Sequence, residues 1–394
     1  MTTPLPTATP EEVGLSSERL ARLRAVMSAE VEQKRVPGAV ALVARRGRVA
    51  LFESFGQRDP ASGAPMANDA IFRIYSMTKP ITSVAAMMLW EEGKFLLSDP
   101  IGKFLPELAD LKVALGHGGI FDRVPLERPI TIQDLMRHTA GFTYEFRSPG
   151  PVQKMYAAAK IARRSQSNAD QVATLAKLPL LHQPGTRWEY GRSTDVIGRL
   201  VEVLSGQPLR EFFEQRILAP LGMVDTAFHV PEPHHSRLAE PFAKDPDTGL
   251  LVRLLEVRDA PKFESGGGGL VSTAGDYARF LQMLLNLGTF DGRRYLSRKT
   301  IELMTADHLG PVTGAPDLLL PGHGFGLGFA VRLHAGIAHV PGSIGQYFWG
   351  GLAGTTFWVD PAEQLFAILL IQAPGQRDYY RTLFRALVYS AVDD

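Results

Sequence analysis

The distribution of strand-forming and helix-forming segments along the chain constrains its fold most. Runs rich in β-branched and apolar residues occur near the N-terminus, at residues 38–43 and 48–55, with Arg45-Arg46-Gly47 as a turn between them. Similar runs return only in the last third of the chain, at residues 325–333, 346–349, 355–359 and 365–372. We therefore expect a single α/β (α+β) domain assembled from both ends of the chain.

The middle of the chain has a different pattern. Short helical segments follow one another there, and strand signals are scarce; the segments are 131–138, 152–164, 169–178, 195–204 and 209–218. We expect a mainly helical domain at 95–262, inserted into an α/β domain formed by 1–94 and 263–394. Further helices are expected within the α/β domain at 16–33, 274–286 and 379–388. The cleft between two such domains is the default position for a site.

Composition and charge exclude several classes of protein. The chain has 394 residues, of which 45% are apolar and 21% charged, as in soluble globular proteins. Its 42 basic and 41 acidic residues give a formal charge of +1 without a long run of either sign, so we expect no nucleic-acid partner. The absence of cysteine excludes disulfides, thiolate catalysis and cysteine metal sites.

The N-terminal sequence and the hydropathy pattern bear on location. The first ten residues lack the basic start and apolar core of a signal peptide. No stretch has the length of uninterrupted apolar sequence that a membrane helix needs. We therefore expect a cytoplasmic protein with no membrane partner, and the sequence carries no signal for an oligomeric state.

One segment near the N-terminus combines a nucleophile with a base. Ser76 precedes a helical pattern, and Lys79 follows three residues later, which places both side chains on one face of the first turn. Pro80 is tolerated there because the first turn has N–H groups without helical partners. A buried lysine loses its charge readily and can activate a serine hydroxyl. The alternative is a capping serine followed by a solvated lysine.

Two later segments supply further candidate groups. Tyr190 ends an irregular segment that begins at Pro184, near two cations that favour its phenolate and a role as base; the alternative is a half-buried tyrosine that caps a loop. The pair Gly350-Gly351 follows Trp349 in a strand, where glycine marks a close approach of backbone or ligand, or a β-bulge. The next N–H, that of Leu352, is a candidate oxyanion donor.

The remaining candidates receive structural interpretations. The ten histidines are scattered, and His234-His235 lacks metal-ligand spacing, so we expect neither a metal nor a cofactor. The glycine run 266–269 lacks the ending of a nucleotide-binding loop and is interpreted as a hinge between the two domains. Tyr144 and Phe146 are candidates either for the wall of an acyl pocket or for the core.

Several motifs occur in an order that resembles a known family. They are Ser76-Met-Thr-Lys79, His138-Thr-Ala-Gly141, Pro184-Gly-Thr-x-Trp-x-Tyr190, Pro220-Leu-Gly-Met223, Ser272-Thr-Ala-Gly-Asp-Tyr-Ala-Arg-Phe280 and Trp349-Gly-Gly351. Together they resemble the serine β-lactamase and penicillin-binding protein fold, an antiparallel sheet flanked by helices with an inserted all-α domain. More narrowly, they resemble the family VIII carboxylesterases of this fold, which are related to the class C β-lactamases.

The resemblance implies a mechanism. Ser76 would attack the carbonyl of a small-molecule ester while Lys79 and Tyr190 shuttle protons, and the backbone N–H groups of Ser76 and Leu352 would hold the oxyanion. The expected activity is that of a carboxylesterase, a serine ester hydrolase for small or short-to-medium acyl chains. His138, within its His-Thr-Ala-Gly segment, is expected to make a structural hydrogen bond.

Two positions depart from the related β-lactamases. Those enzymes carry Lys-Thr-Gly, whose lysine binds the substrate carboxylate, where this chain has Trp349-Gly350-Gly351. Tryptophan cannot pair with a carboxylate, which favours neutral esters. Arg192 stands where those enzymes have asparagine and can bind an anionic substrate group, which leaves acidic substrates open.

Alternative functions remain on the same fold. A β-lactamase or D-alanyl-D-alanine peptidase would cleave amides instead, and an acyltransferase would pass the acyl group to an alcohol. A non-catalytic binding protein would need none of Ser76, Lys79 and Tyr190. A Ser-His-Asp hydrolase of the α/β type is disfavoured because the sequence has no Gly-x-Ser-x-Gly.

Overall fold

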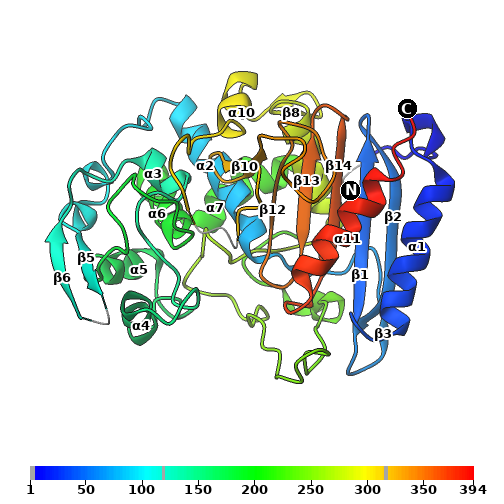
Figure 1. Cartoon of the computed structure of the whole chain (residues 1–394), viewed down its shortest axis with the longest axis horizontal. Helices are drawn as coiled ribbons and strands as arrows, with labels where there is room; N and C mark the ends of the chain where they lie inside the picture. The colour runs from blue at the N-terminus through cyan, green and yellow to red at the C-terminus, as the bar shows by residue number, and fades with distance from the viewer. Residues whose placement is uncertain (1–4, 118–119, 315–317) are drawn as a thin grey trace.

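The computed structural model describes residues 5–117, 120–314 and 318–394 and contains one eight-stranded antiparallel sheet beside a group of helices (Figure 1). The strands, in spatial order, are β10 (His323–Phe325), β11 (Ala330–Arg332), β12 (Tyr347–Gly350), β13 (Thr356–Asp360), β14 (Leu365–Ile371), β1 (Gly38–Arg45), β2 (Arg48–Asp59) and β3 (Ala64–Pro65). Because β1 pairs with β14, the sheet joins the two ends of the chain, as the strand signals predict.

The centre of the sheet is buried on both faces. Along β1, Val40 and Leu42 belong to one hydrophobic cluster, whereas Ala41 and Val43 belong to a second cluster on the opposite face. Each fully buried valine or leucine side chain contributes about 1.5–3 kcal/mol. A strand buried on both faces is continuously apolar, which explains why this segment lacks an alternating pattern.

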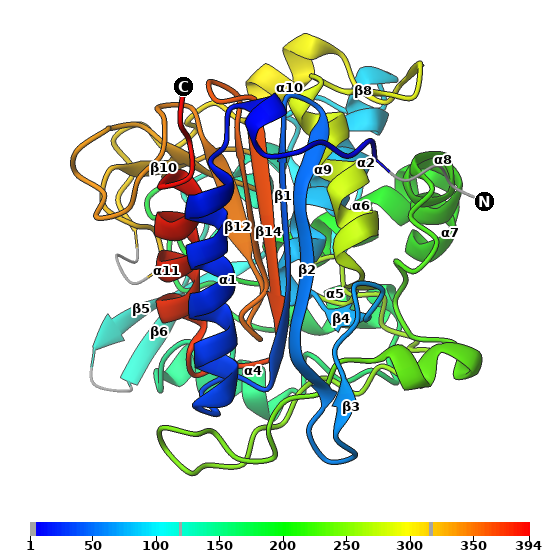
Figure 2. The same cartoon turned by 90° about the vertical axis from the view of Figure 1, so that its right-hand side faces the viewer.

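Two helices from opposite ends of the chain cover one face of the sheet. Figure 2 shows α1 (Ser17–Glu32) and α11 (Arg377–Tyr389) side by side in front of the strands. Ser16 caps α1 by accepting the N–H of Arg19. The hydroxyl of Tyr380 on α11 donates to Glu30 on α1 over 2.9 Å. Both helices confirm the sequence prediction within about two residues.

The other helices lie on the opposite side of the sheet. Among them α2 (Thr78–Glu91) is buried along most of its length and contacts α6. The remaining α-helices are α3 (Ile132–Met136), α4 (Pro151–Ala158), α5 (Asn168–Leu175), α6 (Ser193–Ser205), α7 (Leu209–Phe213), α8 (Ala219–Leu221), α9 (Ala274–Leu285) and α10 (Arg298–Met304). Figure 1 shows α3, α4, α5 and α6 gathered at the end of the molecule away from α1. The limits of the two domains remain a prediction.

The region expected to be all-helical also contains a β-hairpin, which corrects that expectation. Strands β5 (Lys112–His117) and β6 (Ile120–Pro125) pair with each other in antiparallel register. The backbone of Ala114 donates to Leu180, and that of Leu180 donates to Lys112. These long-range contacts extend the ladder, and a short local pattern does not reveal them.

The segment predicted as one strand at 325–333 forms two strands. β10 and β11 pair with Phe325 opposite Ala330, and Gly328 in the turn between them has a φ of 101°. Only glycine adopts that backbone conformation without strain, so the strand signal is interrupted there. None of the helices in the described part of the chain has both the length and the apolar character needed to cross a bilayer.

Candidate active site

Ser76 lies at a corner where a strand becomes a helix. The strand β4 (Phe72–Arg73) pairs with β7 (Val271–Ser272), a short 3-10 turn follows at Tyr75–Met77, and α2 begins at Thr78. Tyr75 has a φ of 44°, which is uncommon for a residue other than glycine and often accompanies functional sites. Its hydroxyl accepts the N–H of Leu255 over 2.7 Å. Ser76 makes no capping bond to α2, so the capping alternative is wrong.

The Lys79 amine is fully buried beside Ser76. Its Nζ lies 3.1 Å from the Ser76 Oγ, 3.0 Å from the Tyr144 hydroxyl and 2.5 Å from the carbonyl oxygen of Gly267. Burial lowers the pKa of Lys79 to about 7, with the Asp195 carboxylate opposing this shift and the Arg192 charge adding to it. Near neutral pH the amine is therefore about half unprotonated and can accept a proton.

Tyr190 lies between Lys79 and the strand β12. The centre of its ring is 4.6 Å from Lys79 Nζ, and its hydroxyl accepts the Trp349 indole N–H over 2.9 Å. Burial raises the pKa of Tyr190, and hydrogen bonds with Ser76 and Trp349 offset this only in part. The resting group is therefore a phenol, which differs from the expected phenolate because burial outweighs the nearby charges.

The loop after β12 closely approaches the segment before Ser76 because its first residue, Gly351, is a glycine. A Cβ atom at Gly351 would clash with the Ile74 carbonyl and the Thr355 hydroxyl. Thr355 Oγ1 also donates to that carbonyl over 3.3 Å, which ties the loop to the segment before Ser76. Arg381 on α11 donates to the Gly351 carbonyl over 2.5 Å. These contacts fix the segment that carries Leu352.

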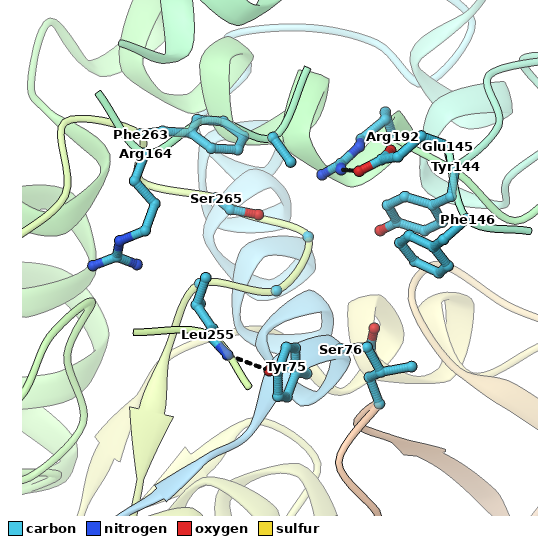
Figure 3. Close-up of a pocket in the computed structure, with 15 residues that line it drawn as sticks. Tyr75, Ser76, Tyr144, Glu145, Phe146, Arg164, Arg192, Leu255, Phe263 and Ser265 are labelled. Atoms are coloured by element: carbon cyan, nitrogen blue, oxygen red, sulfur yellow. Dashed lines mark hydrogen bonds and ion pairs between the residues drawn. The ribbon is translucent and has the colours of Figure 1, made fainter. Parts of the chain in front are cut away.

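Two pockets meet at Ser76, and Phe146 and Leu352 line both of them. The first has a volume of about 190 Å³ and is lined further by Tyr75, Tyr144, Glu145, Ala162, Arg164, Arg192, Leu255, Phe263, Ser265 and Gly267–Gly269 (Figure 3). The second has a volume of about 370 Å³ and is lined further by Arg147, Tyr190, Leu318, Phe348, Trp349, Gly350, Gly351, Thr356, Arg377 and Arg381. The predicted pocket residues therefore divide into two sets.

Tyr144 and Arg192 lie on the wall of the first pocket. The Tyr144 ring stacks on Phe146 with 4.8 Å between ring centres, and its hydroxyl binds Lys79. Figure 3 shows the Arg192 guanidinium turned toward Glu145, to which it donates over 2.5 Å, and a second nitrogen donates to Asp195 over 3.2 Å. The predicted substrate-binding roles of Tyr144 and Arg192 remain predictions.

His138 and His234 lie where we expect, from the sequence, a structural role or exposure to solvent. His138 is fully buried, its Nδ1 lies 3.5 Å from the backbone nitrogen of Gly191, and burial holds its pKa well below the usual value. This fits the expected structural hydrogen bond. His234 is exposed in a 3-10 turn at Glu232–Arg237. Within the described residues, no group of three or more histidine and carboxylate side chains is arranged to hold a metal ion.

Comparison with known proteins decides the family. The model of the Beta-lactamase family matches residues 23–390. This chain belongs to the Beta-lactamase family.

Proteins with related sequences and structures support the assignment. The family member described here is 39% identical to Protein Rv1367c of Mycobacterium tuberculosis over 85% of each chain, and 32% identical to Esterase EstB of Burkholderia gladioli over 89% of each chain. The solved structure of "EstCE1, a hydrolase with promiscuous acyltransferase activity" superposes with a TM-score of 0.79 at 27% identity, covering 95% of this chain and 98% of that one. The protein is an enzyme of the beta-lactamase fold.

Three residues of this Beta-lactamase family site were not found by sequence reasoning. Glu145 and Asp195 hold Arg192, and Gly267 provides a carbonyl acceptor for Lys79. The glycine run that contains Gly267 was interpreted as a hinge, but it forms part of the first pocket. Its lack of side chains was the available signal, because close approach to another group requires glycine.

Proposed function

We propose that this protein is a serine ester hydrolase, a carboxylesterase of the family VIII type, that works through an acyl-enzyme on Ser76. The observation that carries the proposal is the buried Lys79 amine, which lies 3.1 Å from the Ser76 hydroxyl with a pKa of about 7. A base with that pKa is well matched to proton transfer near neutral pH. The 32% identity to Esterase EstB supports the same activity.

The proposed reaction has two stages. Lys79 takes the Ser76 proton as Oγ bonds to the ester carbonyl carbon, and the N–H groups of Ser76 and Leu352 stabilise the resulting oxyanion. The C–O bond to the alcohol then breaks, and Tyr190 donates a proton to the alkoxide while it regains one from Lys79. Water attacks the acyl-enzyme by the same proton path, releasing the carboxylic acid and restoring the Ser76 hydroxyl.

In this proposal, the position of Tyr190 determines which pocket holds the acyl group and which holds the leaving alcohol. Tyr190 lines the second pocket and is absent from the first, so an alcohol that takes its proton leaves through the second pocket. The acyl group then occupies the first pocket, against Tyr144, Phe146 and Phe263. The smaller volume of the first pocket supports small or short-to-medium acyl chains.

Two polar side chains near Ser76 that are predicted to bind substrate, Trp349 and Arg192, already have partners within the protein. The Trp349 indole N–H is used by Tyr190, and both terminal nitrogens of Arg192 donate to carboxylates of the protein. A substrate carboxylate in the first pocket would have to compete with Glu145 and Asp195. This supports an esterase over a β-lactamase or peptidase that recognises an anionic substrate.

Acyl transfer to an alcohol is a second candidate function. The second pocket adjoins Tyr190 and has about twice the volume of the first, so it can hold an acceptor alcohol in place of water. The solved structure of EstCE1 carries acyltransferase activity in its description. Product analysis with a competing alcohol present separates transfer from hydrolysis.

The test is a Ser76→Ala variant assayed on p-nitrophenyl esters of graded acyl length and on a chromogenic cephalosporin. We expect ester turnover to be lost and thermal unfolding to be nearly unchanged. Ser83→Ala is the matched control, because Ser83 lies on the same helix and lines neither pocket. Retained turnover in Ser76→Ala, or wild-type turnover of the cephalosporin in preference to every ester, contradicts the proposal.

A further inference from the structure

Arg192 is linked to both partners that, besides Ser76, hold the Lys79 amine: it contacts Tyr144 directly and reaches Gly267 through Asp195. Those partners are the Tyr144 hydroxyl and the Gly267 carbonyl. A neutral amine has two N–H donors and one lone pair. If the two donors are directed at Tyr144 and Gly267, the lone pair is directed at the Ser76 hydroxyl. The positions of these two acceptors therefore determine whether the amine can act as a base.

Arg192 fixes Tyr144 in two ways. The Arg192 Cζ lies 4.7 Å from the centre of the Tyr144 ring, a cation–π contact. Its Nη2 also donates to Glu145, the next residue in the chain, over 2.5 Å. Figure 3 shows the guanidinium and the Glu145 carboxylate directly above the Tyr144 ring. One guanidinium thus contacts two successive side chains of this segment.

Arg192 fixes Gly267 through Asp195. Its Nη1 donates to one Asp195 oxygen over 3.2 Å, and the other oxygen accepts the Gly267 N–H over 3.0 Å and the Ser265 hydroxyl over 2.5 Å. A Cβ atom at Gly267 would lie 3.0 Å from that oxygen, so glycine allows the close approach. The carbonyl of the same glycine accepts from Lys79.

We propose that Arg192 is a positioning residue for the general base: it holds Tyr144 directly and Gly267 through Asp195, so that the Lys79 lone pair points at Ser76. The inference rests on the proposed function, since it requires Lys79 to act as the base. It assigns Arg192 a role in aligning the amine in place of substrate recognition. A lysine at position 192 would keep the charge but lose the two-pronged guanidinium.

The charges near Lys79 provide a readout that a purely structural role would not produce. The Asp195 carboxylate raises the pKa of Lys79 and the Arg192 guanidinium lowers it. The other titratable groups facing the amine are Tyr144 and Tyr190, whose pKa values burial raises, and His138, whose pKa burial lowers. These three are neutral near pH 7, so replacing Arg192 or Asp195 dominates any change in charge.

The experiment compares the pH dependence of kcat/KM for a p-nitrophenyl ester in three variants and the wild type. Asp195→Asn keeps an oxygen for the Gly267 N–H but removes the negative charge that raises the pKa of Lys79. The acid limb of the pH profile, where the rate rises as Lys79 loses its proton, should therefore move to lower pH. Glu145→Gln/Arg192→Gln replaces an ion pair by amides, and its acid limb should move to higher pH. We expect each shift to be about half a unit or more. Arg192→Lys should leave the limb in place and lower kcat about tenfold with KM unchanged.

The decisive result is that the acid limbs of Asp195→Asn and of Glu145→Gln/Arg192→Gln shift in opposite directions. A general loosening of the fold would shift the acid limbs of both variants in the same direction or leave both in place. Such an outcome overturns the inference, as does full kcat in Arg192→Lys. Thermal unfolding of each variant identifies any that fail to fold. If the Arg192 variants do not fold, Asp195→Asn carries the test alone, and an acid limb that does not move to lower pH in that variant overturns the inference. Labelling of wild-type Ser76 by a phosphonate probe separates the two failures. If the probe labels Ser76 in the wild type but the acid limbs of the variants do not move, only this inference is contradicted. If the probe does not label the wild type, the proposed function is contradicted as well.

Discussion

The two walls of the cleft around Ser76 are built in contrasting ways. One, the charged wall, consists of Lys79, Tyr144, Arg192, Asp195 and Gly267, which are linked by hydrogen bonds and an ion pair. The other, the backbone wall, consists of residues 349–352, where Gly351 allows the chain to lie against the Ile74 carbonyl before Ser76. The first wall is suited to moving protons, and the second to presenting an N–H group.

Tyr190 connects the two walls, since its ring lies over Lys79 and its hydroxyl binds Trp349. The proposed proton path thus depends on side-chain chemistry, whereas the proposed oxyanion site depends on the absence of side chains. Substitutions that change a charge in the charged wall should therefore change the pH dependence of the rate. Those in the backbone wall should change the rate without moving the pH profile.

Among substitutions in the two walls, the largest effect is expected from Lys79→Met, which removes the base and retains an unbranched side chain of similar length. We expect kcat/KM for a p-nitrophenyl ester to fall by about 10³- to 10⁴-fold, the upper part of the range for general acid–base catalysis. Circular dichroism and thermal unfolding should show a folded protein. A loss of less than tenfold would contradict the distinction between the two walls, because it would show that Lys79 in the charged wall is not the general base.

Tyr190→Phe should lower kcat by about 10²- to 10³-fold, because it removes the proton donor for the leaving alcohol but keeps the ring over Lys79. An ester with a better leaving group needs less help from that donor. The loss should therefore be smaller for a p-nitrophenyl ester than for an alkyl ester of the same acid. Equal losses for both esters would indicate a structural role for Tyr190.

Gly351→Ala tests the backbone wall alone. The new methyl group would press on the Ile74 carbonyl and displace the Leu352 N–H from Ser76. We expect about a 10²-fold loss in kcat with an unchanged acid limb. Gly336→Ala is the matched control, because a Cβ atom there meets open space. A shifted acid limb in Gly351→Ala would show that the two walls do not act separately.

The smallest effect is expected from Trp349→Phe, which removes one hydrogen bond to the Tyr190 hydroxyl. A single hydrogen bond has a net value of about 0.5–1.5 kcal/mol, so kcat should fall about two- to tenfold. The measurement is steady-state kinetics on the same ester. An unchanged kcat would show that the contact between the two walls has no part in proton transfer.

The fold could be predicted largely because its signals are local. The continuous apolar run of β1, the helical spacing in α2 and the amphipathic helix α11 are each visible in a short window of sequence. The hairpin β5–β6 was missed although its two strands pair locally; its further contact with Leu180, more than fifty residues away, has no local signal. Non-local pairing leaves only a weak trace in local propensity.

The residues of the candidate site likewise divide into those with a local sequence signal and those without one. The structure brings Ser76, Lys79 and Tyr190 together, and these side chains have recognisable chemistry within short motifs. Gly267 contacts Lys79, and Glu145 and Asp195 contact Arg192, all from segments distant from Lys79 in sequence, and none of the three has a distinctive spacing. The protonated state of Tyr190 depends on burial, which the sequence around it does not report.

The central claim is that a neutral Lys79 takes the Ser76 proton, and the pH dependence of kcat/KM for the wild-type enzyme tests it most directly. Burial lowers the pKa of Lys79 to about 7, and the unprotonated amine is the base. The rate should therefore rise with pH through about 7 and level off above it. A rate that stays constant from about pH 5 to 9, or that rises only near the ordinary lysine pKa of about 10, would contradict the account.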